Sequence, residues 1–147
     1  MSKRQAIKIL KQHAQRITNG RVALLELLME SPKAFALTDF EKQLPISVDR
    51  VTIYRTLHTF ESIGLVLKVI DHKGTGLYIF NSTEHHDVST HPHLRCNECG
   101  KLVCLPCLPE EYLAKLEKYE IGDMYFLMEG TCLECSTTEE KRTNSLL

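Results

Sequence analysis

Three Cys-x-x-Cys pairs constrain this chain more than any other feature. They are Cys96–Cys99, Cys104–Cys107 and Cys132–Cys135, and together they contain all six cysteines. Two thiolates two residues apart can bind one tetrahedral Zn²⁺ from a tight turn, and two such pairs complete a four-thiolate shell. The first and last pairs are separated by 32 intervening residues, so a shared metal would join the two ends of a small domain. The alternative, disulfides or buried free thiols, is disfavoured because every cysteine is in such a pair and no signal peptide is evident.

The charges divide the chain into two unlike parts. The net charge is −1, but residues 1–80 carry twelve Lys and Arg against seven Asp and Glu, and residues 81–147 carry six against twelve. A length of 147 residues suits one domain or two small ones. A basic part beside an acidic, cysteine-rich part predicts one unit for an anionic polymer and another for metal.

The chain is predicted to be cytoplasmic. No apolar run is long enough to span a bilayer, and the residues after Met1, SKRQAIKILKQ, lack the apolar centre of a signal peptide. A reducing compartment keeps thiols available for metal. We therefore expect no membrane partner.

Helical periodicity dominates the basic part. The spacing predicts helices over 3–17, from Arg21 to Ser31, from about Thr38 to Pro45, and from Ser47 or Asp49 as cap to Ile63. Gly64 would follow the last helix as its C′ residue. The buried face of this helix is predicted to consist of the apolar row Val51, Tyr54, Leu57, Phe60 and Ile63.

Two β-rich runs, LVLKVI and GLYIF, follow the fourth helix and predict a hairpin. Helices closed by a hairpin form a winged helix-turn-helix, in which the helix before the wing enters the major groove. Arg50, Thr52, Tyr54, Arg55 and His58 are the side chains of that helix suited to phosphates and base edges. The alternative is that the polar residues are merely solvated and that Tyr54 is in the core.

The acidic part predicts a small α/β unit. LRC and KLVCL read as short strands around a metal knuckle, PEEYLAKLEKYEI as a helix, and MYFLMEG as a further strand. Such a unit is too small to bury much core alone. A four-cysteine zinc would contribute about 10 kcal/mol to its folding, and MYFLM could pair with the same strand of a second copy. A homodimer would also read a palindromic DNA operator.

Several candidate ligands remain beside the predicted hinge at 81–84. They are Glu84, His85, His86, His91, His93, Cys104 and Cys107. Their density favours a second, exchangeable metal site over a set of solvated histidines. A thiolate with imidazoles suits Zn²⁺ better than the harder Mn²⁺.

These motifs together resemble the ferric uptake regulator superfamily of metal-dependent bacterial repressors, which includes zinc, manganese, nickel and peroxide sensors. The resemblance covers about residues 5–136 and rests on the NGR, VTIYRTL, IGLV, HPHLRCNECGKLV and GTCLEC segments. It implies DNA contacts from Arg16, Arg21, Thr52, Tyr54 and Arg55, to which the helix pattern adds Arg50.

The resemblance also implies two metal sites. Cys96, Cys99, Cys132 and Cys135 match a structural zinc site. The regulatory ligands implied by the match are Glu84 or His85, His91, His93 and, in place of a carboxylate, Cys104. The segment KAFALTD lacks the histidine that iron and peroxide sensors usually supply, which favours Zn²⁺ as the second metal, with Fe²⁺ or Mn²⁺ as alternatives.

We therefore predict an α+β chain with a winged-helix DNA-binding domain at 1–82, a metal-binding dimerisation domain at 83–136 and a flexible tail at 137–147. The predicted function is a metal-responsive repressor of metal uptake, without enzymatic activity or a small organic substrate. Three alternatives remain: an iron or peroxide sensor of the same family, a thiol redox protein using Cys104 and Cys107, and a zinc-stapled interaction module without DNA binding.

Overall fold

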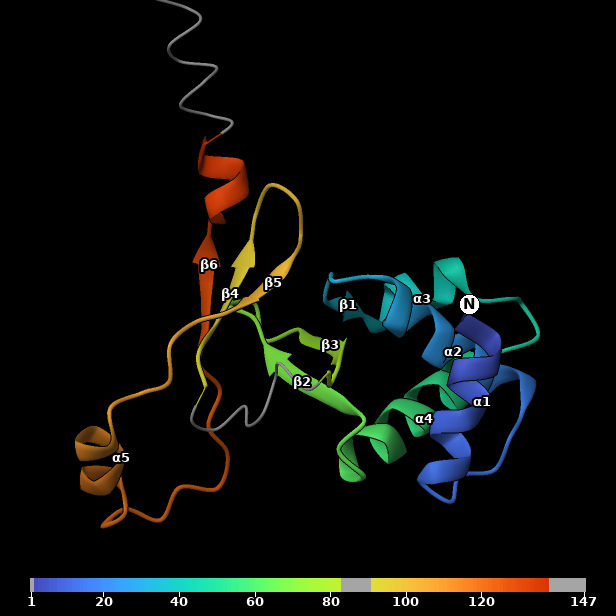
Figure 1. Ribbon diagram of the computed structural model, residues 1–147, viewed down its shortest axis with the longest axis horizontal. Coiled ribbons are helices and arrows are strands. Elements are labelled where there is room, and N and C mark those ends of the chain that lie inside the picture. Colours follow the sequence, from blue (N-terminus) through green and yellow to red (C-terminus); the bar gives the residue numbers. More distant parts are fainter. Residues whose placement is uncertain (1, 83–90, 138–147) are drawn as a thin grey trace, which may run out of the picture. The chain divides into compact units, whose positions relative to one another are not determined.

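The computed structural model describes residues 2–82 and 91–137 of the chain (Figure 1). The chain divides into two compact units, Met1–Thr83 and Glu84–Leu147. Among the described residues, none of the helices is both long enough and apolar enough to cross a membrane.

The first unit combines four helices with a three-stranded sheet. Its elements are α1 (Ser2–Gln12), α2 (Asn19–Glu30), β1 (Phe35–Ala36), α3 (Leu37–Gln43), α4 (Arg50–Ser62), β2 (Val66–Ile70) and β3 (Gly76–Phe80). The predicted hairpin is confirmed, since β2 and β3 are antiparallel with Lys68 opposite Tyr78. The sequence did not predict β1, which pairs with the other edge of β3 to give the order β1-β3-β2.

The first helix is shorter than its apolar periodicity predicts. α1 ends at Gln12, Ala14 adopts a positive φ of 52°, and Ile17 is 43% exposed. Because an alanine in the left-handed region cannot continue a right-handed helix, the chain turns here and the apolar row ends at Leu10. Thr18 then caps α2 by accepting a hydrogen bond from the Arg21 backbone N–H at 3.2 Å.

The third helix also differs from its prediction, because it begins at Leu37 and Thr38 is not its cap. The Asp39 carboxylate accepts a hydrogen bond from the Ala36 backbone N–H at 2.8 Å. This contact turns the chain directly from β1 into α3.

Both ends of α4 match their predictions. Asp49 Oδ1 accepts from the Thr52 backbone N–H at 2.7 Å, which selects Asp49 over Ser47 as the N-cap. At the other end, Gly64 has a φ of 76°. Its N–H donates to the Glu61 carbonyl at 3.1 Å and the Leu65 N–H donates to the Phe60 carbonyl at 2.9 Å, which is the Schellman arrangement. The chain thereby reverses from α4 directly into the wing.

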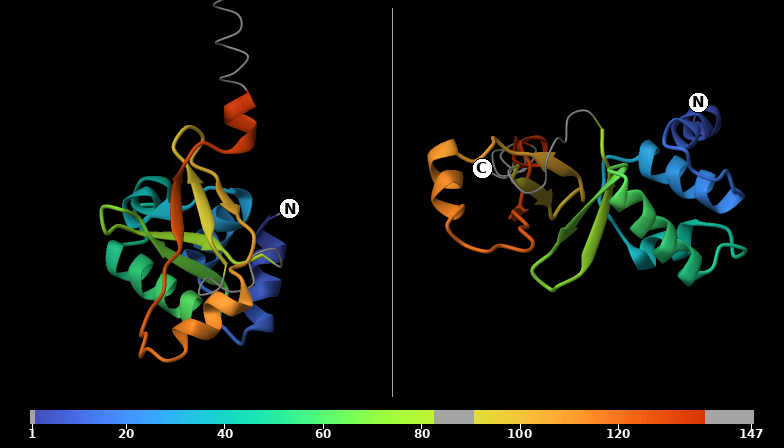
Figure 2. Two further views of the ribbon diagram at one scale, coloured as in Figure 1. Left: turned by 90° about the vertical axis from the view of Figure 1, so that its left-hand side faces the viewer. Right: turned by 90° about the horizontal axis from the view of Figure 1, so that it is seen from below.

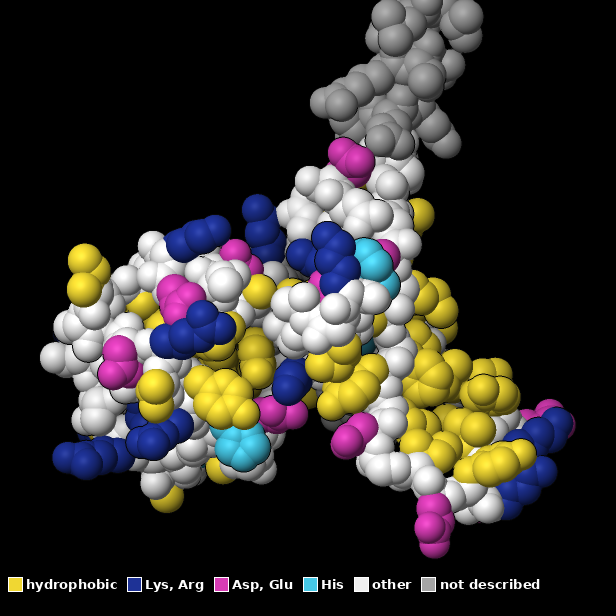
Figure 3. All heavy atoms as spheres, turned by 180° about the vertical axis from the view of Figure 1, so that it is seen from behind, with side chains coloured by type: hydrophobic (Ala, Val, Ile, Leu, Met, Phe, Trp, Pro, Cys, Tyr) yellow, Lys and Arg dark blue, Asp and Glu magenta, His cyan; other side chains and the backbone are white. Residues whose placement is uncertain are grey.

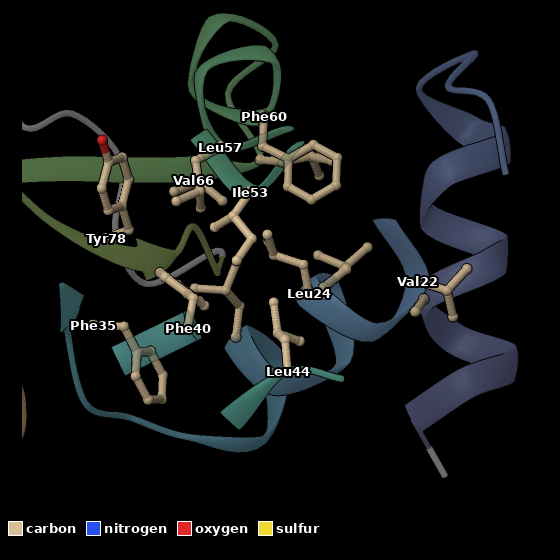
Figure 4. Packing of buried hydrophobic residues seen from close by; sticks show 14 of the residues in the cluster. Val22, Leu24, Phe35, Phe40, Leu44, Ile53, Leu57, Phe60, Val66 and Tyr78 are labelled. Atoms are coloured by element: carbon tan, nitrogen blue, oxygen red, sulfur yellow. The ribbon is translucent and has the colours of Figure 1, made fainter. Parts of the chain in front are cut away.

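The core of the first unit lies between the helices and the hairpin (Figure 4). α4 contributes Ile53, Thr56, Leu57 and Phe60 to it. The predicted apolar row was wrong in its first turn, since Val51 is 56% exposed and Tyr54 is 54% exposed. The inner face starts at Ile53, two residues later than predicted, so α4 presents Val51 and Tyr54 to solvent.

The second unit contains a three-stranded sheet and one short helix, with β4 (His93–Cys96), β5 (Leu102–Cys104), α5 (Glu110–Leu116) and β6 (Leu127–Gly130). β4 is central; it runs antiparallel to β5 and parallel to β6 (Figure 2). α5 is shorter than the predicted helix and has no buried residues. Thr137, the first residue of the predicted tail, belongs to a helical segment; residues 138–147 lie outside the described part.

Candidate metal centres and nucleic-acid interface

The sheet of the second unit brings two distant Cys-x-x-Cys pairs together. Cys96 ends β4, and the parallel register places Gly130, at the end of β6, beside it. The Asn97 N–H donates to the Gly130 carbonyl at 2.7 Å, which holds the first knuckle against the segment leading into Cys132. Gly100 closes that knuckle with a φ of 73°, a conformation that favours glycine.

The four sulfurs of Cys96, Cys99, Cys132 and Cys135 lie within 4.8 Å of one another. The Cys99 and Cys132 sulfurs are 3.9 Å apart. Zn–S bonds of about 2.3 Å at tetrahedral angles give an S–S edge of about 3.8 Å. The cluster therefore fits a structural zinc with four thiolate ligands.

The protonation of this cluster also suits a divalent cation. The backbone N–H groups of Cys132 and Cys99 lower the pKa of Cys96 to about 6, and the Cys132 N–H lies 3.4 Å from the Cys96 sulfur. The neighbouring Cys132 sulfur, together with burial, raises the pKa of Cys135 to about 12. The Cys96 thiol thus ionises readily, whereas the Cys135 thiol resists ionisation. A bound cation would displace the remaining protons and balance the thiolate charge.

A second cluster lies at the other end of the same strands. His93 and Cys104 are directly opposite each other in the β4–β5 register, and His91 lies two residues before His93. Donor atoms of these three residues lie within 4.8 Å of one another, and the two imidazole rings have centroids 5.3 Å apart. The structure therefore brings together three of the predicted regulatory ligands.

The atoms of the second cluster fit a borderline-soft metal. Nε2 of His91 is buried and has no hydrogen-bond partner among residues 2–82 and 91–137, and a buried nitrogen without a partner is costly unless something ligates it. Two imidazoles and one thiolate form a donor set preferred by Zn²⁺. The other predicted ligands, Glu84 and His85, lie outside the described residues.

Cys107 also contacts the second cluster, a role that the sequence left open. Its sulfur lies 3.4 Å from Nδ1 of His91. The Leu105 N–H donates to the Pro92 carbonyl at 2.9 Å, so the chain stays beside the histidine segment beyond the end of β5. The Cys-x-x-Cys spacing was a signal for this contact, but only the strand register shows which histidine is reached.

α4 supplies the candidate nucleic-acid surface. Thr52, Tyr54, Arg55 and His58 are all exposed, which contradicts the alternative that Tyr54 belongs to the core. The Tyr54 and His58 rings lie parallel within 9°, with centroids 6.4 Å apart. The exposed side of α4 thus offers hydrogen-bond donors, a cation and flat rings for contact with bases and phosphates.

The three remaining predicted DNA-contacting arginines differ in exposure and in their side-chain partners. Arg16 is exposed. Arg50 Nε is 3.6 Å from Glu41 Oε1 on the surface. Arg21 is half-buried and donates to Gln15 Oε1 at 3.0 Å, so it also ties the α1–α2 connection together.

The family model of the Ferric uptake regulator family matches residues 12–106 of the chain. The peroxide operon regulator of Bacillus subtilis is 28% identical and spans 92% of this chain and 94% of the relative. The ferric uptake regulation protein of Campylobacter jejuni is 24% identical, over 91% of this chain and 88% of the relative. A zinc uptake regulator solved with zinc and DNA has a TM-score of 0.70 at 21% identity, covering 93% of this chain and 94% of that chain; this likeness shows the fold.

Proposed function

The chain belongs to the Ferric uptake regulator family, whose members are metal-responsive transcription regulators and not enzymes, and from this premise we propose that it is a cytoplasmic repressor of metal uptake that responds to Zn²⁺. The observation that carries the choice of metal is the cluster of His91, His93 and Cys104. A thiolate in the exchangeable site selects for Zn²⁺ over the harder Mn²⁺. Glu84 or His85 would complete the shell.

The four-cysteine cluster would hold a separate zinc ion permanently, as a structural metal. Cys96, Cys99, Cys132 and Cys135 supply four closed thiolate positions, a shell typical of structural zinc. Such a zinc has no open coordination position, so it would not exchange with the cellular signal. Its contribution is to keep β4 and β6 together.

We infer that DNA is bound by a homodimer through α4. Thr52, Tyr54 and Arg55 are the central contacts, with Arg16, Arg21 and Arg50 as additional basic groups. Outward-facing apolar side chains support the dimer: Tyr112 in α5, and Tyr119, Ile121 and Tyr125 in the segment that follows, are exposed. Figure 3 shows hydrophobic side chains gathered on the surface. β6 is an edge strand in the described sheet, and such an edge can accept a strand from a second copy. A two-fold dimer would read a palindromic operator.

Metal would control DNA binding by differential affinity. Zn²⁺ at the second site can favour the DNA-competent arrangement only to the extent that it binds that arrangement more tightly. By the same linkage, operator DNA should raise the affinity of the second site for Zn²⁺.

The test is metal content followed by metal-dependent DNA binding. A duplex selected from random DNA by the zinc-loaded protein would serve as the operator. Mild chelation should remove one zinc per protomer and abolish binding, and Zn²⁺ should restore it where Fe²⁺ and Mn²⁺ do not. Restoration by Fe²⁺ or Mn²⁺ alone would refute zinc sensing, and metal-independent binding would refute sensing altogether.

The same test includes controls for the DNA surface. Tyr54→Ala and Arg55→Ala should abolish operator binding and leave both zinc ions in place. An interaction module that does not bind DNA would be unaffected in its activity by either substitution. A thiol redox protein would instead show disulfide reductase activity that depends on Cys104 and Cys107.

Peroxide sensing is the second candidate function. It is favoured by the 28% identity to a peroxide operon regulator and by the adjacent rings of His91 and His93. If Fe²⁺ were the cofactor, peroxide would oxidise one of these rings. Mass spectrometry of the iron-loaded protein after peroxide treatment would detect a 2-oxo-histidine in that case and none in a zinc sensor.

A further inference from the structure

We propose that Cys107 is a positioning residue of the second metal site: its sulfur holds Nδ1 of His91 so that Nε2 faces the metal. This inference rests on the proposed function, because it assumes that His91, His93 and Cys104 bind a metal. It assigns a role to the one cysteine that belongs to neither of the two ligand clusters.

The fold brings Cys107 to His91 through the strand register. His93 is opposite Cys104, so the residues before His93 run beside the residues after Cys104. The hydrogen bond from the Leu105 N–H to the Pro92 carbonyl extends this pairing by one step. Pro106 would be the next residue opposite His91, and one residue beyond it Cys107 reaches His91, with the Nδ1 and Sγ atoms 3.4 Å apart.

The two nitrogens of His91 have different surroundings. Nδ1 contacts the Cys107 sulfur, whereas Nε2 is buried without a hydrogen-bond partner in the described part of the chain. In a neutral imidazole one nitrogen carries the proton and the other has the free lone pair. A sulfur that accepts a hydrogen bond from Nδ1–H leaves the Nε2 lone pair for the metal.

This arrangement matches the general construction of histidine ligands. A metal-binding imidazole usually donates its second N–H to a partner that fixes the tautomer and the ring orientation. Carboxylates and carbonyls commonly fill this role, and here a thiol or thiolate would do so. Cys107 is itself exposed, which suits a group outside the ligand shell better than a fourth ligand.

The expected effect of removing the sulfur is on metal affinity. Loss of such a partner typically weakens metal binding by about 10–100-fold. Cys107→Ala should therefore weaken the second site by a factor in this range. Cys107→Ser should bind metal more tightly than Cys107→Ala, because its hydroxyl oxygen can still accept a hydrogen bond from Nδ1–H. Zinc in the four-cysteine site should stay at one per protomer in both variants, which reports that the fold is intact.

Co²⁺ distinguishes a positioning residue from a ligand. A thiolate bound to Co²⁺ gives a near-ultraviolet charge-transfer band whose intensity per bound ion grows with the number of thiolates. Cys107→Ala saturated with Co²⁺ should keep the full intensity of the wild-type second site, while Cys104→Ala should lose it. Half the intensity in Cys107→Ala would overturn the proposal by showing that Cys107 is a ligand, and an unchanged affinity would overturn it by showing that the contact does nothing.

Histidine ring resonances give an independent readout. In the zinc-loaded wild type, long-range proton–nitrogen spectra should show His91 with the proton on Nδ1, and Cys107→Ala should shift that Nδ1–H signal. Metal bound through Nδ1 would overturn the proposal. A wild-type protein without a second metal would refute the proposed function together with this inference. Full metal binding with no effect of Cys107→Ala would refute the inference alone.

Discussion

Replacement of Cys96 by serine should unfold the second unit and leave the first unit folded. Cys96 is 1% exposed and joins the two halves of the four-cysteine cluster, because its sulfur lies 3.4 Å from the Cys132 N–H. A serine hydroxyl is not a zinc ligand at neutral pH. The variant would therefore retain three of the four thiolates and lose the closed shell.

The size of the effect follows from what else holds the second unit together. Among its described residues, Leu102 and Pro92 are the only buried apolar residues besides two of the zinc-cluster cysteines. Full burial of one leucine contributes about 1.5–3 kcal/mol, whereas a structural zinc contributes about 10–16 kcal/mol at pH 7. Domains are stable by only about 5–15 kcal/mol, so the unit should not survive loss of the zinc.

Amide exchange measured residue by residue is the appropriate assay, with zinc content determined in parallel. Protection should disappear in β4 and β6 and persist in α4 and the β2–β3 hairpin. Cys107→Ser is the matched control, since it makes the same substitution outside the four-cysteine cluster and should keep both the protection and the zinc of that cluster. Protected β4 and β6 amides in a zinc-free Cys96→Ser protein would refute the reasoning.

Two further predictions concern the first unit. Phe60 is fully buried in the core, so Phe60→Ala should destabilise the first unit by about 3–5 kcal/mol in urea titration, against less than about 0.5 kcal/mol for the exposed Tyr54→Ala. Gly64→Ala should cost about 1 kcal/mol, because φ there is 76°, whereas Gly122→Ala, which lies in the second unit and has no positive φ, should leave the unfolding of the first unit unchanged in the same titration.

Local chemistry explains what the sequence predicted well. The Asp49 cap, the Gly64 C′ position and the wing hairpin each depend on a few neighbouring residues, and each is present in the structure. The four cysteines were predicted to meet because two close pairs suit one tetrahedral ion, and their sulfurs do lie together. Such features need no knowledge of distant packing.

Tertiary packing explains the errors. An apolar row beginning at Val51 and one beginning at Ile53 fit the same helical period, and only the position of the core decides between them. Strand β1 has two residues, too few for any periodicity. The contact between Cys107 and His91 depends on the β4–β5 register, which spacing along the chain does not specify. Glu84 and His85 remain predictions.

The wide separation of the two outer Cys-x-x-Cys pairs has a consequence for biosynthesis. Every element of the first unit is complete by residue 80, and domains generally fold in order as the chain leaves the ribosome. The second unit cannot close until Cys132 and Cys135 have been made, because these two thiolates follow β6 at the end of the unit. A chain that ended between residue 80 and Cys132 would carry an intact recognition helix on a second unit unable to retain zinc. Zinc occupancy therefore separates finished chains from truncated ones, which would have the recognition helix but could not respond to metal.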